Sequence, residues 1–382
     1  MKTYDVAIIG AGSIGTPLSF YLAQRGLQVV VLEELASIGR GQNRSAIGGI
    51  RATHSDPAKA TICQRTIEII KRMKIEHGFD VDWIAGGYLY PVYDDKNEDI
   101  FKKLIQFQRS LGLNIDWIGS TEIQQLAPGI NPENLRGGSY SPEDGSASPL
   151  KVVDAYYQLA RQRGVEFRFQ EPVTGFKLDK AKIIKVVTSK SNYSCHWIIN
   201  AAGASARQVG SLLSLDLPVF PDCHEGGITE PVRRFFEPMV VDVRPDSESS
   251  NYYFYQNIEG QVVFCITPEP KIVGTDCDNT SAFLPLVTKR MLGLYPRLRH
   301  LRVRRTWRGL YPMTPDGFPI VGFTPEITNL FLAVGMCGQG FMIGPGLGEI
   351  VAEILTNKDH QFHEILNQLS LYRNFSGQEL LK

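Results

Sequence analysis

The chain has 382 residues, which at roughly 150 residues per domain predicts two or three domains. Hydrophobic residues make up 43% of the chain and charged residues 21%, so a disordered polypeptide is excluded. Forty Lys and Arg residues balance 40 Asp and Glu residues, and this zero net charge gives no support to a nucleic-acid or anionic-membrane partner.

The six cysteines are scattered along the chain without a C-x-x-C pair, so they predict neither a zinc site nor a disulfide framework. We expect reduced thiols, most of them buried, in a cytoplasmic protein. No segment reaches the ~18 consecutive apolar residues of a transmembrane helix. No cluster of metal-ligand residues stands out, so we expect neither a membrane span nor a metal site.

The N-terminal segment has the pattern of a βαβ unit. Tyr4–Ile9 and Leu27–Leu32 are apolar, strand-like runs, and residues 13–25 between them predict a helix that Gly26 ends. A G-x-G-x-x-G motif at residues 10–15 joins the first strand to this helix. Such glycines permit a tight turn, a close approach of the backbone to a pyrophosphate, and close packing of helix on strand.

An acidic residue ends the second strand of this unit, where a carboxylate can bind the hydroxyls of a ribose. Glu33 takes this place, and its neighbour Glu34 is the alternative. Strand, glycines, helix, strand and acid together predict a dinucleotide site without deciding between NAD and FAD. Its residues are Gly10, Ala11, Gly12, Ser13, Ile14, Gly15, Glu33 and Glu34.

Helical and strand-like segments follow in a mixed order. They are a helix from Asp56-Pro57 to about His77, a strand-like segment at 80–95, a helix at 98–111, a helix from Ser148-Pro149 to about Arg163, short strands over 165–199, a strand-rich region at 219–319, a strand at 330–334 and a helix at 341–355. This order predicts an α/β fold of two interleaved domains. A Rossmann-like cofactor domain takes residues 1–86, 146–217 and 321–382, and an antiparallel β-rich substrate domain takes residues 87–145 and 218–320.

Four further motifs carry a resemblance to a known family. They are Gly48-Gly49-Ile50-Arg51, Asn200-Ala201-Ala202-Gly203, Thr306–Pro312 with Thr314–Gly317, and Gly338–Met342 running into Gly346–Glu349. With the N-terminal motif, they make the whole chain resemble the FAD-dependent amine and amino-acid oxidoreductases of the D-amino-acid-oxidase superfamily. The similar branch holds sarcosine oxidase with its beta subunit, dimethylglycine dehydrogenase and the flavin subunit of archaeal proline dehydrogenase.

This resemblance implies an FAD site that includes segments far from the N-terminus. The further cofactor-binding residues that it implies are Ala46, Ile47, Gly48, Gly49, Val173, Ala201, Ala202, Gly203, Gly309, Gly338, Gln339, Gly340, Phe341 and Met342. It also implies a reaction: a hydride passes to flavin N5 from the carbon beside an amine, and the imine then hydrolyses in water. The resemblance thus predicts oxidation of a secondary or cyclic amino acid, of the sarcosine, dimethylglycine, proline or hydroxyproline type.

Three departures from the family pattern are informative. Gly309 stands where monomeric sarcosine oxidase has the cysteine that tethers its flavin, so we expect non-covalent FAD. Met342 stands where that enzyme has the lysine that promotes the reaction with oxygen, which favours a dehydrogenase over an oxidase. Tyr311 stands where glycine oxidase and D-amino-acid oxidase hold the carboxylate with an arginine, which argues against that branch.

Five residues are candidates for contact with the substrate. The candidates are Arg51, His54, Tyr253, Glu225 and Arg308, each with a structural role as its alternative. Two alternative functions stay open at this point: a D-amino-acid or 2-hydroxy-acid dehydrogenase of the same fold, and an electron-relay flavin subunit of a hetero-oligomer. A dehydrogenase of a secondary or cyclic amino acid, of a D-amino acid or of a 2-hydroxy acid could each pass its electrons to an external acceptor or to a partner redox subunit.

Overall fold

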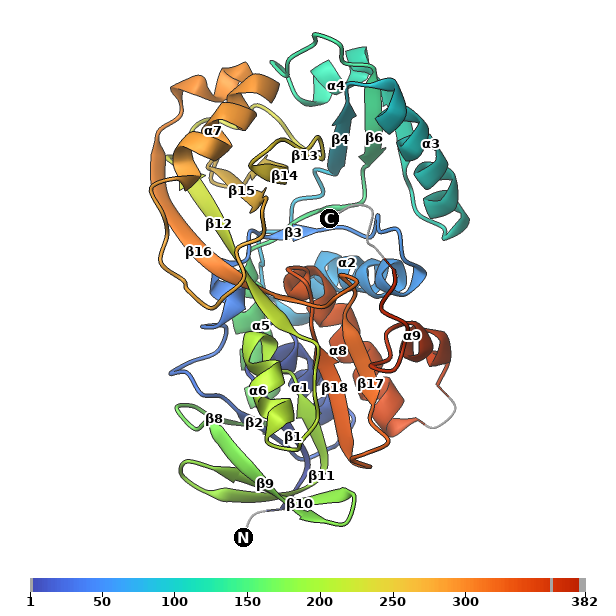
Figure 1. The fold of residues 1–382 in the computed structure, drawn as a ribbon, viewed down its shortest axis with the longest axis vertical. Coiled ribbons are helices and arrows are strands. Elements are labelled where there is room, and N and C mark those ends of the chain that lie inside the picture. Colours follow the sequence, from blue (N-terminus) through green and yellow to red (C-terminus); the bar gives the residue numbers. More distant parts are fainter. Residues whose placement is uncertain (1–2, 358–359, 378–382) are drawn as a thin grey trace.

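The computed structural model describes residues 3–357 and 360–377. Figure 1 shows two stacked parts, each built on one large sheet, with β3 and α2 between them. Strands of both sheets come from separated stretches of the chain, so each part is assembled from several segments. The architecture is an α/β two-domain fold with a mixed, largely parallel sheet and a second, largely antiparallel sheet, as predicted. The residue boundaries predicted for the two domains stay a prediction.

The first sheet has the strand order β17-β18-β11-β1-β2-β8, and β11 also carries the β9–β10 hairpin. Its strands are β1 (Thr3–Ile9), β2 (Val29–Leu32), β8 (Glu166–Arg168), β9 (Val173–Asp179), β10 (Lys182–Thr188), β11 (Asn192–Asn200), β17 (Ile320–Phe323) and β18 (Leu330–Val334). The strands from β18 to β8 run parallel, and β17 is antiparallel to β18. Their apolar side chains are buried on both faces, which explains the unbroken runs of Val and Ile in β1 and β2.

Helices cover this sheet, and their ends follow the capping signals in the sequence. They are α1 (Gly15–Gln24), α2 (Pro57–His77), α5 (Pro149–Gln162), α6 (Ala206–Ser211), α8 (Gly340–Thr356) and α9 (His363–Gln368). The carboxylate of Asp56 accepts a hydrogen bond from the Lys59 backbone N–H at 2.8 Å, and Gly78 ends α2 in the left-handed conformation. The predicted bounds of α2 are therefore confirmed.

The second sheet has the order β16-β12-β15-β14-β13-β4-β6-β5. Its strands are β4 (Tyr88–Val92), β5 (Asp116–Gly119), β6 (Gly137–Ser141), β12 (Phe220–Thr229), β13 (Met239–Asp242), β14 (Ser249–Gln256), β15 (Val262–Pro268) and β16 (Val303–Met313). Only the β4–β13 pairing is parallel. Its outer elements include α3 (Asp95–Ser110), α4 (Ser120–Leu126) and α7 (Phe283–Leu294), and β3 (Gly49–Ile50) pairs separately with β7 (Gly145–Ser146). Three short 3-10 helices at Gln42–Ser45, Gly203–Ser205 and Pro296–His300 complete the fold.

Two predicted elements have different bounds in the structure. The strand-like segment at 80–95 forms a strand only over Tyr88–Val92, since Gly87 takes a left-handed φ of 81° before it. The helix predicted to begin at Glu98 begins at Asp95, because the Asp94 carboxylate accepts from the Asn97 backbone N–H at 2.9 Å. In both places a local backbone feature, rather than the apolar pattern, sets the boundary.

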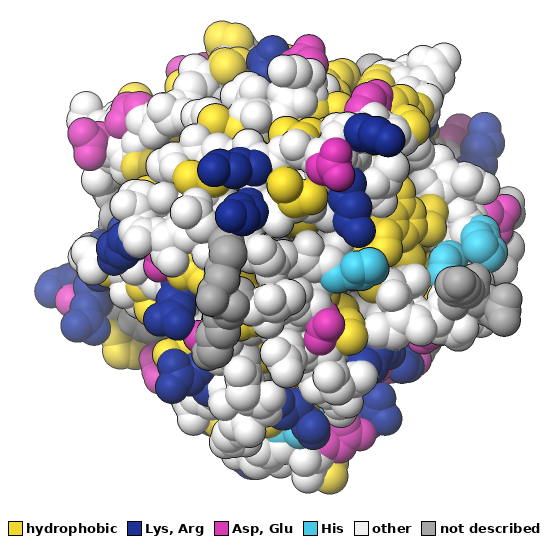
Figure 2. Space-filling model, turned by 90° about the horizontal axis from the view of Figure 1, so that it is seen from below, with side chains coloured by type: hydrophobic (Ala, Val, Ile, Leu, Met, Phe, Trp, Pro, Cys, Tyr) yellow, Lys and Arg dark blue, Asp and Glu magenta, His cyan; other side chains and the backbone are white. Residues whose placement is uncertain are grey.

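Basic and acidic side chains are mixed on one face of the molecule, and none of the six cysteines forms a disulfide bond. On the face seen from below, basic and acidic side chains are both spread over the surface (Figure 2). The six cysteines are free thiols, four of them buried. Among residues 3–357 and 360–377, no helix is both long enough and apolar enough to cross a membrane.

Candidate active site

A cavity lies between the two sheets. From the first sheet it is lined at the carboxyl ends of parallel strands, by Ile9, Leu32, Ala201 and Val334. From the second sheet it is lined by side chains of β4, β12, β13, β14, β15 and β16. The carboxyl edge of a parallel sheet is where open α/β folds bind their ligands. The cavity is therefore the candidate active site.

The turn after β1 forms one end of this cavity. A Cβ atom on Gly12 would meet no atom within 4 Å and would point into open space, and Gly12 itself lines the cavity. A Cβ atom on Gly15 would lie 2.0 Å from the carbonyl oxygen of Gly10, so Gly15 permits helix α1 to pack against the turn. The turn just before α1, at Gly12, Ser13 and Ile14, therefore lines the cavity, and Gly12 places no side chain between the cavity and the backbone N–H groups of this turn.

Glu33 is held rigidly at the end of β2. Its Oε2 accepts a hydrogen bond from the Ala11 backbone N–H at 2.7 Å, and its Oε1 accepts one from the Leu35 backbone N–H at 2.8 Å. Burial raises the pKa of Glu33 above its ordinary value, although these two hydrogen bonds oppose the shift. Glu34 lies beside it with an exposed side chain and accepts a hydrogen bond from the Ser205 hydroxyl at 3.3 Å.

Most predicted cofactor residues line the cavity, but two do not. Those that line it are Gly10, Gly12, Ser13, Ile14, Glu33, Glu34, Ala46, Ile47, Gly48, Gly49, Val173, Ala201, Ala202, Gly203, Gly309, Gly338, Gln339, Gly340, Phe341 and Met342. Ala11 and Gly15 are not among the lining residues. The Ala11 backbone N–H is used by Glu33, and Gly15 packs against Gly10, so both shape the turn from behind.

The other end of the cavity is enclosed by the start of α8 and the segment before β3. Gly338 has a φ of 80°, and a Cβ atom there would lie 2.4 Å from the ring of Tyr311. Tyr255 reaches from the second sheet and donates from its hydroxyl to the Ile47 carbonyl oxygen at 2.7 Å. These contacts fix both segments against the second sheet.

Sequence reasoning missed a buried lysine behind this end of the cavity. Lys59, on α2, is fully buried, and its Nζ donates to the Gln339 side-chain oxygen at 3.2 Å. Its ammonium group also lies 4.6 Å from the centre of the Phe318 ring. The sequence signal was ambiguous, because a lysine in the first turn of an amphipathic helix is ordinarily exposed.

The second sheet turns a row of aromatic and polar side chains toward the cavity. Tyr253 on β14 and Tyr311 on β16 have their hydroxyl oxygens 3.2 Å apart, and the His224 ring stacks on Tyr311 with centroids 3.7 Å apart. Burial holds the pKa of both tyrosines well above 10, so both hydroxyls stay protonated at neutral pH. Tyr253 was predicted to line the pocket and it does, whereas His224 was not singled out.

Arg51 is the only Lys or Arg among the described residues that line the cavity. It is buried and donates from Nη1 to the Thr53 carbonyl oxygen. The nearby carboxylate of Asp144 is also buried and accepts from the Ala52 backbone N–H and the Thr53 hydroxyl, both at 2.9 Å. Burial raises the pKa of Asp144, and these hydrogen bonds and the charge of Arg51 oppose the shift.

Three other predicted substrate contacts turn away from the cavity. His54 is fully buried, with its Nε2 3.4 Å from the Cys63 Sγ, and does not line the cavity. Glu225 touches the cavity, but its carboxylate accepts from the backbone N–H and the hydroxyl of Thr280. Arg308 pairs across the strands with Glu225 and donates to Asp276 at 2.7 Å.

Strand alternation explains the positions of Glu225 and Arg308. Successive side chains of a strand point to opposite faces. Since His224 and Gly226 line the cavity, the carboxylate of Glu225 points to the other face of β12. The same alternation places Arg308 there, opposite Glu225 in the register of β12 and β16.

Within the described residues, no group of three or more His, Cys, Asp or Glu side chains comes together to hold a metal ion. The polar groups at the cavity are instead backbone N–H groups, hydroxyls, amides and the single guanidinium of Arg51. Such a set suits an organic ligand with phosphates and hydroxyls.

Comparison with known proteins gives one family and several relatives over nearly the whole chain. The family model described as DAO, FAD dependent oxidoreductase, matches residues 5–354. The chain is 25% identical to sarcosine oxidase subunit beta of Rhizobium meliloti (strain 1021), over 92% of this chain and 84% of that protein. It is 23% identical to glycine oxidase of Geobacillus kaustophilus (strain HTA426), over 94% of each.

A solved structure has the same fold over almost its full length. The crystal structure of L-proline dehydrogenase from P. horikoshii superposes with a TM-score of 0.91 at 29% identity, and the match covers 97% of this chain and 98% of that one. The fold built on the two sheets is therefore shared with this relative over almost the whole chain.

Proposed function

Because this chain belongs to the DAO family of FAD-dependent oxidoreductases and is an oxidoreductase of amino acids or amines, we propose that it is a dehydrogenase of a secondary or cyclic amino acid. The observation that carries the proposal is the composition of the cavity. One buried cation, Arg51, faces it for a carboxylate. The stacked rings of His224 and Tyr311, with Tyr253 beside them, close it with an aromatic surface. Such a pocket suits a compact, partly apolar zwitterion.

The residues at the cavity fit FAD. The open space at Gly12 takes a pyrophosphate against the N-terminus of α1, and both oxygens of Glu33 keep lone pairs for ribose hydroxyls. Asn43 lines the same cavity, and its Oδ1 accepts no hydrogen bond from the described residues although it is buried. A hydroxyl-rich chain that runs from the turn at residues 10–15 to α8 would supply a donor to Asn43.

When bound, FAD supplies the hydride acceptor, and the chain supplies position and charge stabilisation. The N-terminus of α8, from Gly340 onward, faces the cavity with backbone N–H groups and a partial positive charge. These groups would stabilise negative charge on a cofactor that is reduced in this cavity. Lys59 holds the Gln339 side chain at this helix terminus.

The chain's own side chains orient the substrate. We assign the carboxylate to Arg51, which keeps it in charge-assisted hydrogen bonds. Tyr253 and Tyr311 stay protonated and cannot act as anionic bases, so we assign them to packing and hydrogen bonding. The substrate amine must arrive as the free base, because a protonated nitrogen has no lone pair to assist hydride loss.

The preference for a dehydrogenase is supported by Met342. It lines the cavity with a thioether, which cannot stabilise developing superoxide as a fixed cation would. Electrons would then leave to an external acceptor or to a partner redox subunit.

The experiment is anaerobic reduction of the purified flavoprotein with a panel of amino acids, amines and hydroxy acids, followed by admission of air. We expect a secondary or cyclic amino acid to bleach the flavin, and the colour to return slowly. Met342→Lys should accelerate reoxidation at least tenfold, and Met342→Leu should not change it. Rapid reoxidation of the wild type with peroxide release would overturn the dehydrogenase assignment. Bleaching by hydroxy acids alone would overturn the substrate class, and no bleaching would indicate an electron-relay subunit.

A further inference from the structure

A buried amide in the cavity has an unused hydrogen-bond donor. Asn251 on β14 is 4% exposed and lines the cavity. Its Oδ1 accepts a hydrogen bond from the Thr267 hydroxyl at 3.1 Å, across the β14–β15 register. Its Nδ2 is fully buried and donates to no acceptor among the described residues. Buried amides without a partner are rare in folded proteins, because desolvation of the N–H groups is then not repaid.

Strand alternation places this amide in the row that forms the aromatic wall of the cavity. Asn251, Tyr253 and Tyr255 point to one face of β14, and Tyr255 occupies the end of the row that contacts Ile47. Asn251 therefore lies at the other end, one pleat beyond Tyr253. Thr267 lies beside it on β15, and it also lines the cavity.

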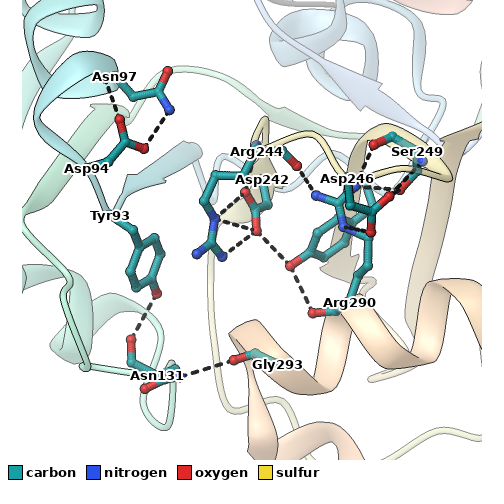
Figure 3. A network of polar contacts seen from close by, with 11 residues as sticks. Tyr93, Asp94, Asn97, Asn131, Asp242, Arg244, Asp246, Ser249, Arg290 and Gly293 are labelled. Atoms are coloured by element: carbon teal, nitrogen blue, oxygen red, sulfur yellow. Dashed lines mark hydrogen bonds and ion pairs between the residues drawn. The ribbon is translucent and has the colours of Figure 1, made fainter. Parts of the chain in front are cut away.

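Hydrogen bonds of Tyr252 and of the Ser249 backbone hold the start of β14 in place on either side of Asn251. Tyr252 donates from its hydroxyl to Asp242 at 2.9 Å, and Asp242 also binds Arg244. Arg290 donates to the Ser249 carbonyl oxygen at 3.1 Å, and Ser249 donates its backbone N–H to Asp246 at 2.8 Å. Figure 3 shows this network around Asp242, Arg244, Asp246, Ser249 and Arg290. It fixes the start of β14 and so presets the direction of the amide.

The side chains of Asn251 and Thr267 together favour a neutral ligand group. A carboxylate at Asn251 and Thr267 would leave its charge without a cation, since Arg51 is the only Lys or Arg at the cavity within the described chain. An ammonium group would find no acceptor in Nδ2. A hydroxyl accepts from Nδ2 and donates to a free lone pair of the Thr267 hydroxyl, which uses both partners.

We propose that Asn251 and Thr267 form a subsite for a hydroxyl group on the carbon skeleton of the substrate, which makes the substrate a hydroxylated amino acid. The inference rests on the proposed function, because it assumes that an amino acid occupies this cavity. It adds a specificity-determining contact at the end of the pocket away from Ile47.

The test compares matched pairs that differ by one hydroxyl: proline with the isomers of 3- and 4-hydroxyproline, and N-methylalanine with N-methylserine. Each compound is titrated into the holoenzyme, and the Kd is read from the perturbation of the flavin spectrum. The rate of anaerobic reduction is measured separately. We expect one hydroxylated member to bind at least about tenfold more tightly than its partner, since a site built around a hydroxyl leaves polar groups unpaired when it is missing.

Variants test whether the preference for the hydroxylated compound comes from Asn251 and Thr267. Asn251→Leu should bring the ratio of the two Kd values close to one while changing the Kd of the unhydroxylated member less than threefold, and Thr267→Val should reduce the ratio partly. Ile266→Val, beside Thr267 on the opposite face of β15, removes one methyl group and no hydrogen bond, so it is the matched control and should keep the wild-type ratio. Unchanged spectra and unfolding temperatures show that the variants fold.

The two proposals fail in different ways. Equal binding of both members by the wild type, no binding of any hydroxylated member, or a preference that survives Asn251→Leu would each overturn the subsite. If the hydroxylated compounds bind with the expected preference but none reduces the flavin, the subsite stands and the assignment as a dehydrogenase fails.

Discussion

Replacing Gly12 by alanine should separate cofactor binding from folding. The new methyl group would meet no protein atom within 4 Å and Gly12 has an ordinary φ, so the free energy of unfolding of the apoprotein should change by less than ~0.5 kcal/mol. The methyl group would instead occupy cavity space assigned to the pyrophosphate. Overpacking costs about 1–3 kcal/mol, which corresponds to FAD binding that is roughly 5- to 150-fold weaker.

Gly15→Ala is the matched control, three positions along the same motif. Its Cβ would lie 2.0 Å from the Gly10 carbonyl oxygen. A Cβ on Gly10 would itself lie 2.5 Å from the Ala201 oxygen, so the turn has little room to yield. We expect a loss of about 3 kcal/mol or more in the apoprotein.

The assay has two parts: thermal unfolding of the apoproteins and titration with FAD followed by quenching of flavin fluorescence. Gly12→Ala should keep the unfolding temperature of the wild-type apoprotein and lose FAD affinity, and Gly15→Ala should unfold earlier even without FAD. If Gly12→Ala binds FAD as tightly as the wild type, or is destabilised as much as Gly15→Ala, the assignment of that space to the pyrophosphate is refuted.

Three further predictions concern the substrate, the fold and the cofactor linkage. Arg51→Lys should weaken amino-acid binding at least tenfold, because a point charge replaces a planar guanidinium, and leave the Kd for FAD within about threefold; equal loss of both affinities would indicate a structural role instead. Asp316 is buried and Arg373 is half-buried, and two hydrogen bonds of 2.8 and 2.9 Å join them, so Asp316→Asn should cost about 1.5–3 kcal/mol at neutral pH. Burial opposes ionisation of Asp316, but Arg373 and the Phe318 backbone N–H hold its pKa below the ordinary value. The stability that Asp316 adds is thus present above its unfolded pKa of ~3.9 and is lost as the pH falls through its folded pKa, so unfolding measured near pH 3 should show a smaller gap between wild type and variant than at pH 7. Finally, Gly309 offers no side chain to a flavin, so acid precipitation should release all FAD into the supernatant, and a yellow pellet would contradict this.

Local signals in the sequence were enough to predict the βαβ unit at the N-terminus and both ends of α2. The G-x-G-x-x-G motif and the acid after β2 fall where they were expected, and Asp56, Pro57 and Gly78 mark both ends of α2. These features depend on neighbours within one turn of helix or one strand end, because capping, left-handed turns and apolar runs are properties of short segments.

The substrate side depended on information that no short segment holds. Glu225 and His224 are adjacent, and which of them faces the cavity was decided by the register of β12 between β15 and β16. His54 follows Arg51 closely but packs beside Cys63, away from the cavity. The alternation of side chains along a strand leaves open which face of the strand turns to the cavity. The pairing and packing of the strands in the folded sheet decide this.

The sequence by itself indicated a dinucleotide site from the local spacing of strand, glycines, helix and acid, and it indicated FAD only through the resemblance of the whole chain to a family. The tertiary structure alone decided which side chains meet at the substrate. Lys59 reaches Gln339 across a gap of hundreds of residues in the chain, and Asn251 meets Thr267 only once β14 and β15 have paired. That the Nδ2 group of Asn251 finds no acceptor among the described residues becomes visible only when every neighbour is in place, because whether a polar group is satisfied depends on the whole of its surroundings.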